Sequence, residues 1–169
     1  MQQNIIKPLF LLLFSSDSIL RKTHSLLLGI VISCSCYPSS AQASRSITIN
    51  QGLMAQPVTI KGISGGAIMA KEISQTENTA TGYCDGYVSS QPNHVIKLES
   101  FWEFLRLEII SQADTTILVK GVGGVWCNDD AGTPNPLIEG QWQPGLYEIW
   151  VGSYQANSEN DYQIKITGR

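Results

Sequence analysis

The feature that most constrains the fold is a series of short segments in which apolar residues alternate with polar ones or are β-branched. Successive side chains of a β-strand point to opposite faces, so this period of two predicts strands with one face in a core. Gly, Pro, Asn and Asp separate the segments, as expected for turns. The pattern predicts an all-β chain folded as an antiparallel β-sandwich. The predicted strands are residues 46–49, 57–60, 94–98, 104–110, 115–121, 145–152 and 162–167.

The same alternation predicts which side chains face the core. In one strand, Leu105, Leu107 and Ile109 share a face, and Arg106 and Glu108 lie on the other. Two further strands have the inward sets Tyr147, Ile149 and Val151, opposite Glu148 and Trp150, and Tyr162, Ile164 and Ile166. Residues 67–74 are compatible with a short helix, which the pattern leaves undecided, and residues 75–82 are predicted to be a polar linker.

The first 43 residues have the features of an export signal. Basic residues and two short apolar runs precede Ala41-Gln42-Ala43, a small-x-small cleavage site. Neither run approaches the roughly 18 apolar residues that span a bilayer, so we expect no transmembrane span in the mature chain. We predict a signal peptide over 1–43 and a secreted or periplasmic protein. Alternatively, Val31 to Cys34 resembles a bacterial lipobox, in which Cys34 would carry a lipid and anchor the protein to the envelope.

Cleavage after Ala43 would leave two cysteines, Cys84 and Cys127, in the mature chain. In an oxidising compartment such a pair is expected to form a disulfide. A zinc site is disfavoured, because His94 is the only histidine left and no C-x-x-C motif is present. The formal net charge of −3 disfavours nucleic acid as a partner, since phosphates need Lys and Arg, and it favours cations.

The stretch from Val125 to Gly140, VWCNDDAGTPNPLIEG, concentrates the ligand types that calcium prefers. Asn128, Asp129, Asp130 and Asn135 offer carboxylate and amide oxygens within eight residues. The spacing does not match an EF-hand loop. Asx side chains, Gly and Pro also build ordinary turns, so a rigid turn and a cation site both remain open. A catalytic acid pair is disfavoured, because no nucleophile or base accompanies the two aspartates.

One motif raises the question of catalysis. Residues 62–66, GISGG, match G-x-S-x-G with Ser64 as nucleophile, and Asp85 and His94 follow in hydrolase order. That motif requires a strand-to-helix elbow in a large α/β sheet, for which the chain is too short and too rich in predicted strands. We interpret the motif as a Gly-rich turn and His94 as a structural residue, and we predict that the protein is not an enzyme.

Five aromatic residues gather in the last third of the chain: Trp126, Trp142, Tyr147, Trp150 and Tyr154. Exposed Trp and Tyr rings on a sandwich can stack on sugar rings, and buried ones fill the core. Both interpretations stay open on sequence alone.

The residues from Thr115 to Tyr154 resemble the bacterial pre-peptidase C-terminal (PPC) domain family. The motifs that carry the resemblance are Asp129-Asp130, Asn135-Pro136-Leu137-Ile138, Pro144-Gly145-Leu146-Tyr147 and Val151-Gly152. The resemblance covers about residues 83–168. The chain is also similar to small secreted bacterial proteins that carry SGG, a Cys before a Gly, a Pro-x-His strand and WCNDD.

The resemblance implies a jelly-roll-like sandwich over 83–169, preceded by an N-terminal β segment and linker over 44–82. It also implies an accessory or binding role, with calcium held by the acidic turn. We therefore expect a secreted, non-catalytic binding module whose partner is a glycan or a cell-envelope component. The alternative is a lipid-anchored structural envelope protein without a metal site. The sequence does not predict the oligomeric state.

Overall fold

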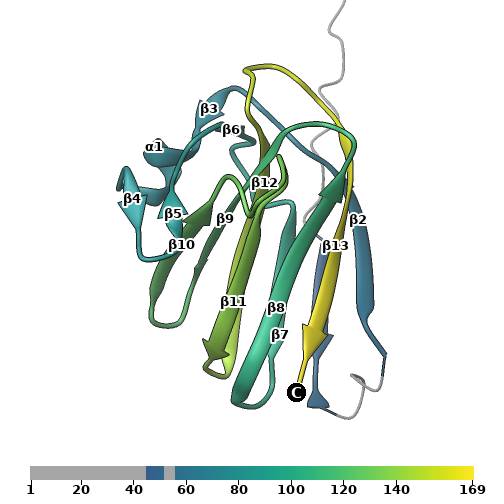
Figure 1. The fold of residues 1–169 in the computed structure, drawn as a ribbon. Helices are drawn as coiled ribbons and strands as arrows, with labels where there is room; N and C mark the ends of the chain where they lie inside the picture. Colours follow the sequence, from purple (N-terminus) through teal and green to yellow (C-terminus); the bar gives the residue numbers. More distant parts are fainter. Residues whose placement is uncertain (1–44, 52–55) are drawn as a thin grey trace, which may run out of the picture. The chain divides into compact units, whose positions relative to one another are not determined.

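Two β-sheets pack face to face and enclose the main core (Figure 1). The computed structural model describes residues 45–51 and 56–169. One sheet has four strands in the order β11-β8-β13-β2. The other has seven strands along the path β1-β7-β12-β6-β3, with β9 pairing both β12 and β10. The predicted all-β sandwich is confirmed.

The bounds of the elements follow the sheets. The four-stranded sheet contains β2 (Val58–Ile63), β8 (Trp102–Ser111), β11 (Leu137–Trp142) and β13 (Asp161–Gly168). The seven-stranded sheet contains β1 (Arg45–Ile49), β3 (Ile68–Met69), β6 (Tyr87–Val88), β7 (His94–Leu98), β9 (Thr115–Gly121), β10 (Gly124–Asn128) and β12 (Gly145–Ser153). A small hairpin of β4 (Asn78–Thr79) and β5 (Gly82–Tyr83) and the helix α1 (Ala70–Ser74) complete the described elements.

The core is built from the side chains that the alternation predicts. Leu107, Ile149 and Ile164 each have 0% of their surface exposed, and their strand neighbours of the same face are also buried. Burying a large aliphatic side chain contributes roughly 1.5–3 kcal/mol, so these three strands supply much of the driving force. The inward sets predicted for β8, β12 and β13 are confirmed.

Trp150 is an exception to the predicted pattern, because it lies on the outer face of β12 and is nevertheless only 4% exposed. It belongs to a second apolar cluster that contains Val88, Leu118 and the cysteines Cys84 and Cys127. The residues between β2 and β7, which include α1 and β3 to β6, contribute Ala70, Cys84 and Val88 to this cluster. The central strands β9 and β12 are therefore covered on both faces, which a simple alternation does not reveal.

The described residues of the predicted segment 44–82 are not separate from the sandwich. β1 pairs with β7 and β2 pairs with β13, so this segment contributes a strand to each sheet. The predicted boundary at residue 83 is therefore not a structural boundary. The pairing of β1 with β7 is parallel, in contrast to the antiparallel pairing predicted throughout. Residues 75–82, predicted as a polar linker, contain β4 and the start of β5, and the undecided stretch 67–74 becomes helical at α1.

Among the described strands of five residues or more, two were not predicted. β10 and β11 flank the acidic turn, and their apolar residues are few and interrupted by Gly, Asn and Glu. The predicted signal peptide over 1–43, including Cys34, lies outside the described residues. Within the part of the chain that is described, no helix has the length and apolar character to cross a membrane.

Candidate functional site

Three aspartates meet at one end of the sandwich, and we call them the acidic cluster: Asp114, Asp129 and Asp130. β9 and β10 form an antiparallel hairpin whose register pairs Asn128 with Ile117. Residues that follow Asn128 therefore lie beside residues that precede Ile117. This register brings Asp114, which comes directly before β9, to the two aspartates that come directly after β10.

The carboxylates of the acidic cluster are close enough to act together. One oxygen from each aspartate lies within 4.8 Å of the others. The Oδ1 atom of Asp129 is buried and has no hydrogen-bond partner among the described residues. Burial, and then the negative charges of Asp130, Asp114 and Asp85, raise the pKa of Asp129 from 3.8 to about 6. Burial and the charge of Asp130 also raise the pKa of Asp114. A cation bound between these carboxylates would favour their ionised forms and lower both pKa values.

No basic side chain among the described residues forms an ion pair with the acidic cluster. The ion pairs in the described part of the chain join Lys71 to Glu77, Arg106 to Glu108 and Glu139, and Lys165 to Glu108. None of them includes a member of the cluster. The cluster therefore concentrates negative charge that no described lysine or arginine compensates.

The two asparagines predicted as calcium ligands hold the loop between β10 and β11 in shape. Asn128 donates from Nδ2 to the carbonyl of Thr81 (2.8 Å) and accepts from the amide of Leu137 (3.0 Å). Asn135 accepts at Oδ1 from the hydroxyl of Thr115 (2.7 Å) and donates from Nδ2 to the carbonyl of Ser111 (3.0 Å). These bonds fix both ends of the turn that carries Asp129 and Asp130, so the two asparagines position the aspartates.

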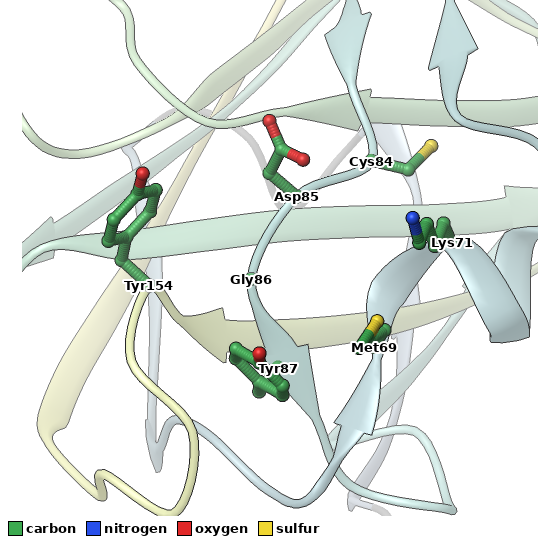
Figure 2. Close-up of a pocket in the computed structure, with 7 residues that line it drawn as sticks. All are labelled: Met69, Lys71, Cys84, Asp85, Gly86, Tyr87 and Tyr154. Carbon is green, nitrogen blue, oxygen red and sulfur yellow. The ribbon is translucent and has the colours of Figure 1, made fainter.

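A pocket of ≈ 350 Å³ lies next to the acidic cluster, and we call it the tyrosine pocket. Its walls are Met69, Lys71, Cys84, Asp85, Gly86, Tyr87 and Tyr154. Figure 2 shows Tyr154 on one side of the segment from Cys84 to Tyr87, and Lys71 on the other. Two interactions connect pocket and cluster: Asp85 acts on the pKa of Asp129, and the amide of Tyr154 donates to the carbonyl of Asp114 (3.3 Å).

Three kinds of contact fix the segment from Cys84 to Tyr87, which forms one wall of the tyrosine pocket. Cys84 forms the predicted disulfide with Cys127 on β10, and both cysteines are buried. Gly86 has a φ of +82°, and a Cβ at this position would lie 2.6 Å from Thr116, so only glycine fits here. The amide of Ala70 donates to the carbonyl of Gly86 (2.9 Å). The backbone of the pocket is therefore fixed by a covalent bond, by packing and by α1.

The residues with a hydrolase-like order do not form a catalytic unit. Ser64 is 1% exposed, and its hydroxyl lies 2.8 Å from that of Ser153. The Nε2 atom of His94 lies 2.7 Å from the hydroxyl of Tyr162, and the imidazole is buried. Ser64 and His94 thus have separate partners in the interior, as expected for structural residues.

Three of the five aromatic residues in the last third of the chain are interior. Trp142, Tyr147 and Trp150 are 6%, 1% and 4% exposed, so they fill core positions. Trp126 is partly buried, and its ring centroid lies 6.0 Å from that of Trp142. Tyr154 alone among the five is well exposed, at 53%. The sugar-platform interpretation therefore fails for three of the five rings and remains open for Tyr154.

The sequence did not predict that Asp114 and Asp85 lie beside the acidic turn. Asp114 is 15 residues before Asp129, and Asp85 is 44 residues before it, so neither belongs to the same motif. The register of the β9–β10 hairpin is the signal that would have located Asp114, but β10 was not recognised as a strand. Asp85 is brought to the site by the disulfide of its neighbour Cys84.

Comparison with known proteins gives a sequence relative and several similar solved structures. No protein-family model matches the chain. The chain is 30% identical over 88 residues to an uncharacterized protein of Synechococcus elongatus, a match that covers 50% of this chain and 65% of the relative. The chain thus matches slightly less than two thirds of that protein's length.

Two of the solved structures to which the chain is similar are described here. The pre-peptidase C-terminal domain of a collagenase from Bacillus anthracis aligns with a TM-score of 0.44 at 13% identity, over 74% of this chain and 97% of that domain. PliG of Aeromonas hydrophila, a periplasmic inhibitor of g-type lysozyme, aligns with a TM-score of 0.41 at 12% identity, over 75% of this chain and 100% of PliG.

Proposed function

We propose that this protein is a non-catalytic extracytoplasmic binding module that holds a calcium ion at the acidic cluster. The observation that carries the proposal is the convergence of three carboxylates within 4.8 Å of one another, without a compensating lysine or arginine in the described residues. Calcium takes six to eight oxygen ligands and accepts irregular geometry, so carboxylates and nearby backbone carbonyls of a turn suit it. We expect Asp114, Asp129 and Asp130 to be the protein's carboxylate ligands, with Asn128 and Asn135 holding their loop.

The disulfide between Cys84 and Cys127 supports the extracytoplasmic location, because such bonds form and persist in oxidising compartments. The buried, hydrogen-bonded states of Ser64 and His94 support a role without catalysis. A glycan or another component of the cell envelope is the partner that we expect for such a module.

Thermal unfolding in EDTA and in millimolar calcium tests the cation site. A ligand that binds only the folded state adds RT ln(1 + [L]/Kd) to the free energy of unfolding. We expect calcium to raise the melting temperature of the wild-type protein and to leave that of Asp129→Asn/Asp130→Asn unchanged. Asp161→Asn removes an exposed aspartate on β13, outside the cluster, and serves as the matched control that keeps the response.

A wild-type melting temperature that is the same in EDTA and in calcium would reject the cation site. The loop would then be a turn only, as in the alternative of a structural envelope protein. A response to magnesium of equal size would assign the site to divalent cations in general.

A further inference from the structure

We propose that the tyrosine pocket binds one uncharged hexopyranose unit of a glycan. This inference rests on the binding role proposed above, to which it adds a location and a ligand class. The pocket does not require the cation for its shape, because its walls are Met69, Lys71, Tyr154 and the segment from Cys84 to Tyr87. The cation site and the sugar pocket can therefore be tested separately.

The size of the tyrosine pocket favours a small ligand over a protein surface. Its volume of ≈ 350 Å³ lies at the lower end of the range of about 300–1,000 Å³ that is usual for small-molecule sites. A stable protein partner would need to cover about 800 Å² on this chain. The exposed large apolar side chains at the pocket are only Met69 and Tyr154, at 40% and 53%. The pocket is therefore suited to a compact group such as a single sugar ring.

Tyr154 supplies the apolar face that a sugar ring needs. A pyranose presents a face of C–H groups, and an aromatic ring is the protein surface that packs best against such a face. Tyr154 lies on the loop that follows β12, and more than half of its surface is open to solvent. Exposing a large ring in a pocket wall costs hydrophobic stabilisation, which a ligand stacked on the ring would recover.

Asp85 and Lys71 supply the polar groups that hydroxyls require. A carboxylate accepts hydrogen bonds from sugar hydroxyls, and an ammonium donates to them. Lys71 bonds Glu77 at 3.4 Å, but both side chains are largely exposed, and such a pair contributes little. The ammonium is thus able to turn towards a ligand at small cost. The carboxylate of Asp85 in the pocket wall repels anionic groups, which favours an uncharged sugar over an acidic one.

Internal contacts hold the backbone of the tyrosine pocket in place. The disulfide, the close approach of Gly86 to Thr116 and the bond from Ala70 hold its wall from Cys84 to Tyr87. A rigid site loses little conformational entropy when a ligand binds. This matters for a weak ligand such as one sugar ring, whose few contacts leave little free energy to order a mobile loop.

The test is a binding survey of the purified protein on an array of uncharged oligosaccharides that includes maltotriose, cellotriose, mannotriose and chitotriose. Titration calorimetry with a positive sugar then compares variants in EDTA and in calcium. We expect Tyr154→Ala to weaken binding roughly tenfold, the upper end for loss of one aromatic contact. Asp85→Asn should also weaken it. Tyr83→Ala removes a tyrosine that is 63% exposed and does not line the pocket, so it should bind as wild type.

The outcomes separate this inference from the cation site. Sugar binding that persists in EDTA and in Asp129→Asn, but is lost in Tyr154→Ala, supports the pocket whatever calcium does. A calcium-dependent melt without binding to any uncharged sugar keeps the cation site and rejects the pocket. Binding that is equal in Tyr154→Ala and wild type, or restricted to acidic sugars, also rejects it. If no sugar on the array binds and a protein partner is found whose binding depends on Tyr154, the proposed sugar pocket is also rejected.

Discussion

At the scale of single residues, Asp129 is the described side chain whose pKa differs most from its ordinary value. Its pKa is raised to about 6 because it is partly desolvated and has three other carboxylates near it. Between about pH 4 and pH 6 the folded state therefore binds more protons at this residue than the unfolded state does. The free energy of unfolding consequently falls as the pH rises through that window, and the lost stability is regained at lower pH.

We predict that Asp129→Asn stabilises the calcium-free protein at pH 7 by about 1 kcal/mol. This figure is reduced for solvent screening, because the carboxyl group remains partly exposed. The variant should also remove most of the fall in stability between pH 4 and pH 6. Urea unfolding in EDTA across this range measures both effects, with Asp161→Asn as control. In calcium the sign should reverse, since the wild type gains a ligand that the variant cannot hold. A variant with the same pH dependence as wild type would contradict the environment assigned to Asp129.

At the scale of elements, the loops at the acidic end depend on the strands that carry them. The β9–β10 hairpin aligns Asp114 with Asp129, and Asn128 and Asn135 fasten the loop into β11. The disulfide joins the segment after β5 to β10, which places Asp85 beside the same loop. The site is thus a product of pairing between elements, and each element contributes one or two of its side chains.

We predict that Cys84→Ala/Cys127→Ala lowers the free energy of unfolding by about 4 kcal/mol, as the chain-entropy model gives for a sequence separation of 43 residues. The loss is largely a gain in freedom of the unfolded chain, and the cysteines' buried packing adds to it. Urea unfolding of the variant and of reduced wild type measures the effect. Similar midpoints for the oxidised wild type and the variant would show that the disulfide adds no stability.

At the scale of the whole molecule, both sheets of the sandwich include strands from the beginning of the described chain, and one includes its last strand. β1 and β2 lie early in the chain and extend opposite sheets, and β13 lies between β8 and β2. Removal of the residues before 44 would leave all of these described strands in place. The sequence expectation of an exported protein is therefore compatible with the described fold.

We predict that the exported protein begins at Ser44. Intact-mass spectrometry of protein recovered from the producing bacterium measures this directly, because cleavage after Ala43 leaves a free amino terminus on Ser44. A mass that corresponds to a diacylglyceryl group on Cys34 would instead establish the lipid-anchored alternative. An unprocessed mass would contradict both.

Period-two alternation by itself determined the inward residues of β8, β12 and β13, because each strand's faces are set by its own neighbours in sequence. The disulfide was also predictable from the sequence, because the expected mature chain has two cysteines and they can pair only with each other. The alternation did not reveal β10 and β11, in which glycines and polar residues interrupt the apolar positions. It also misplaced Trp150, because the sequence of β12 does not show that other segments cover its outer face.

The membership of the acidic cluster was decided only by tertiary structure. Asp129 and Asp130 are adjacent in the sequence, whereas Asp114 joins them through strand register, and a disulfide brings Asp85 near the cluster. Asn128 and Asn135 have the side-chain oxygens that calcium prefers. In the structure their side-chain amides donate hydrogen bonds to backbone carbonyls of other segments and thereby hold the loop in place. A local sequence pattern predicts which side chains share one face of a strand. Which distant groups share a site depends on how strands pair and sheets pack, and no single segment contains that information.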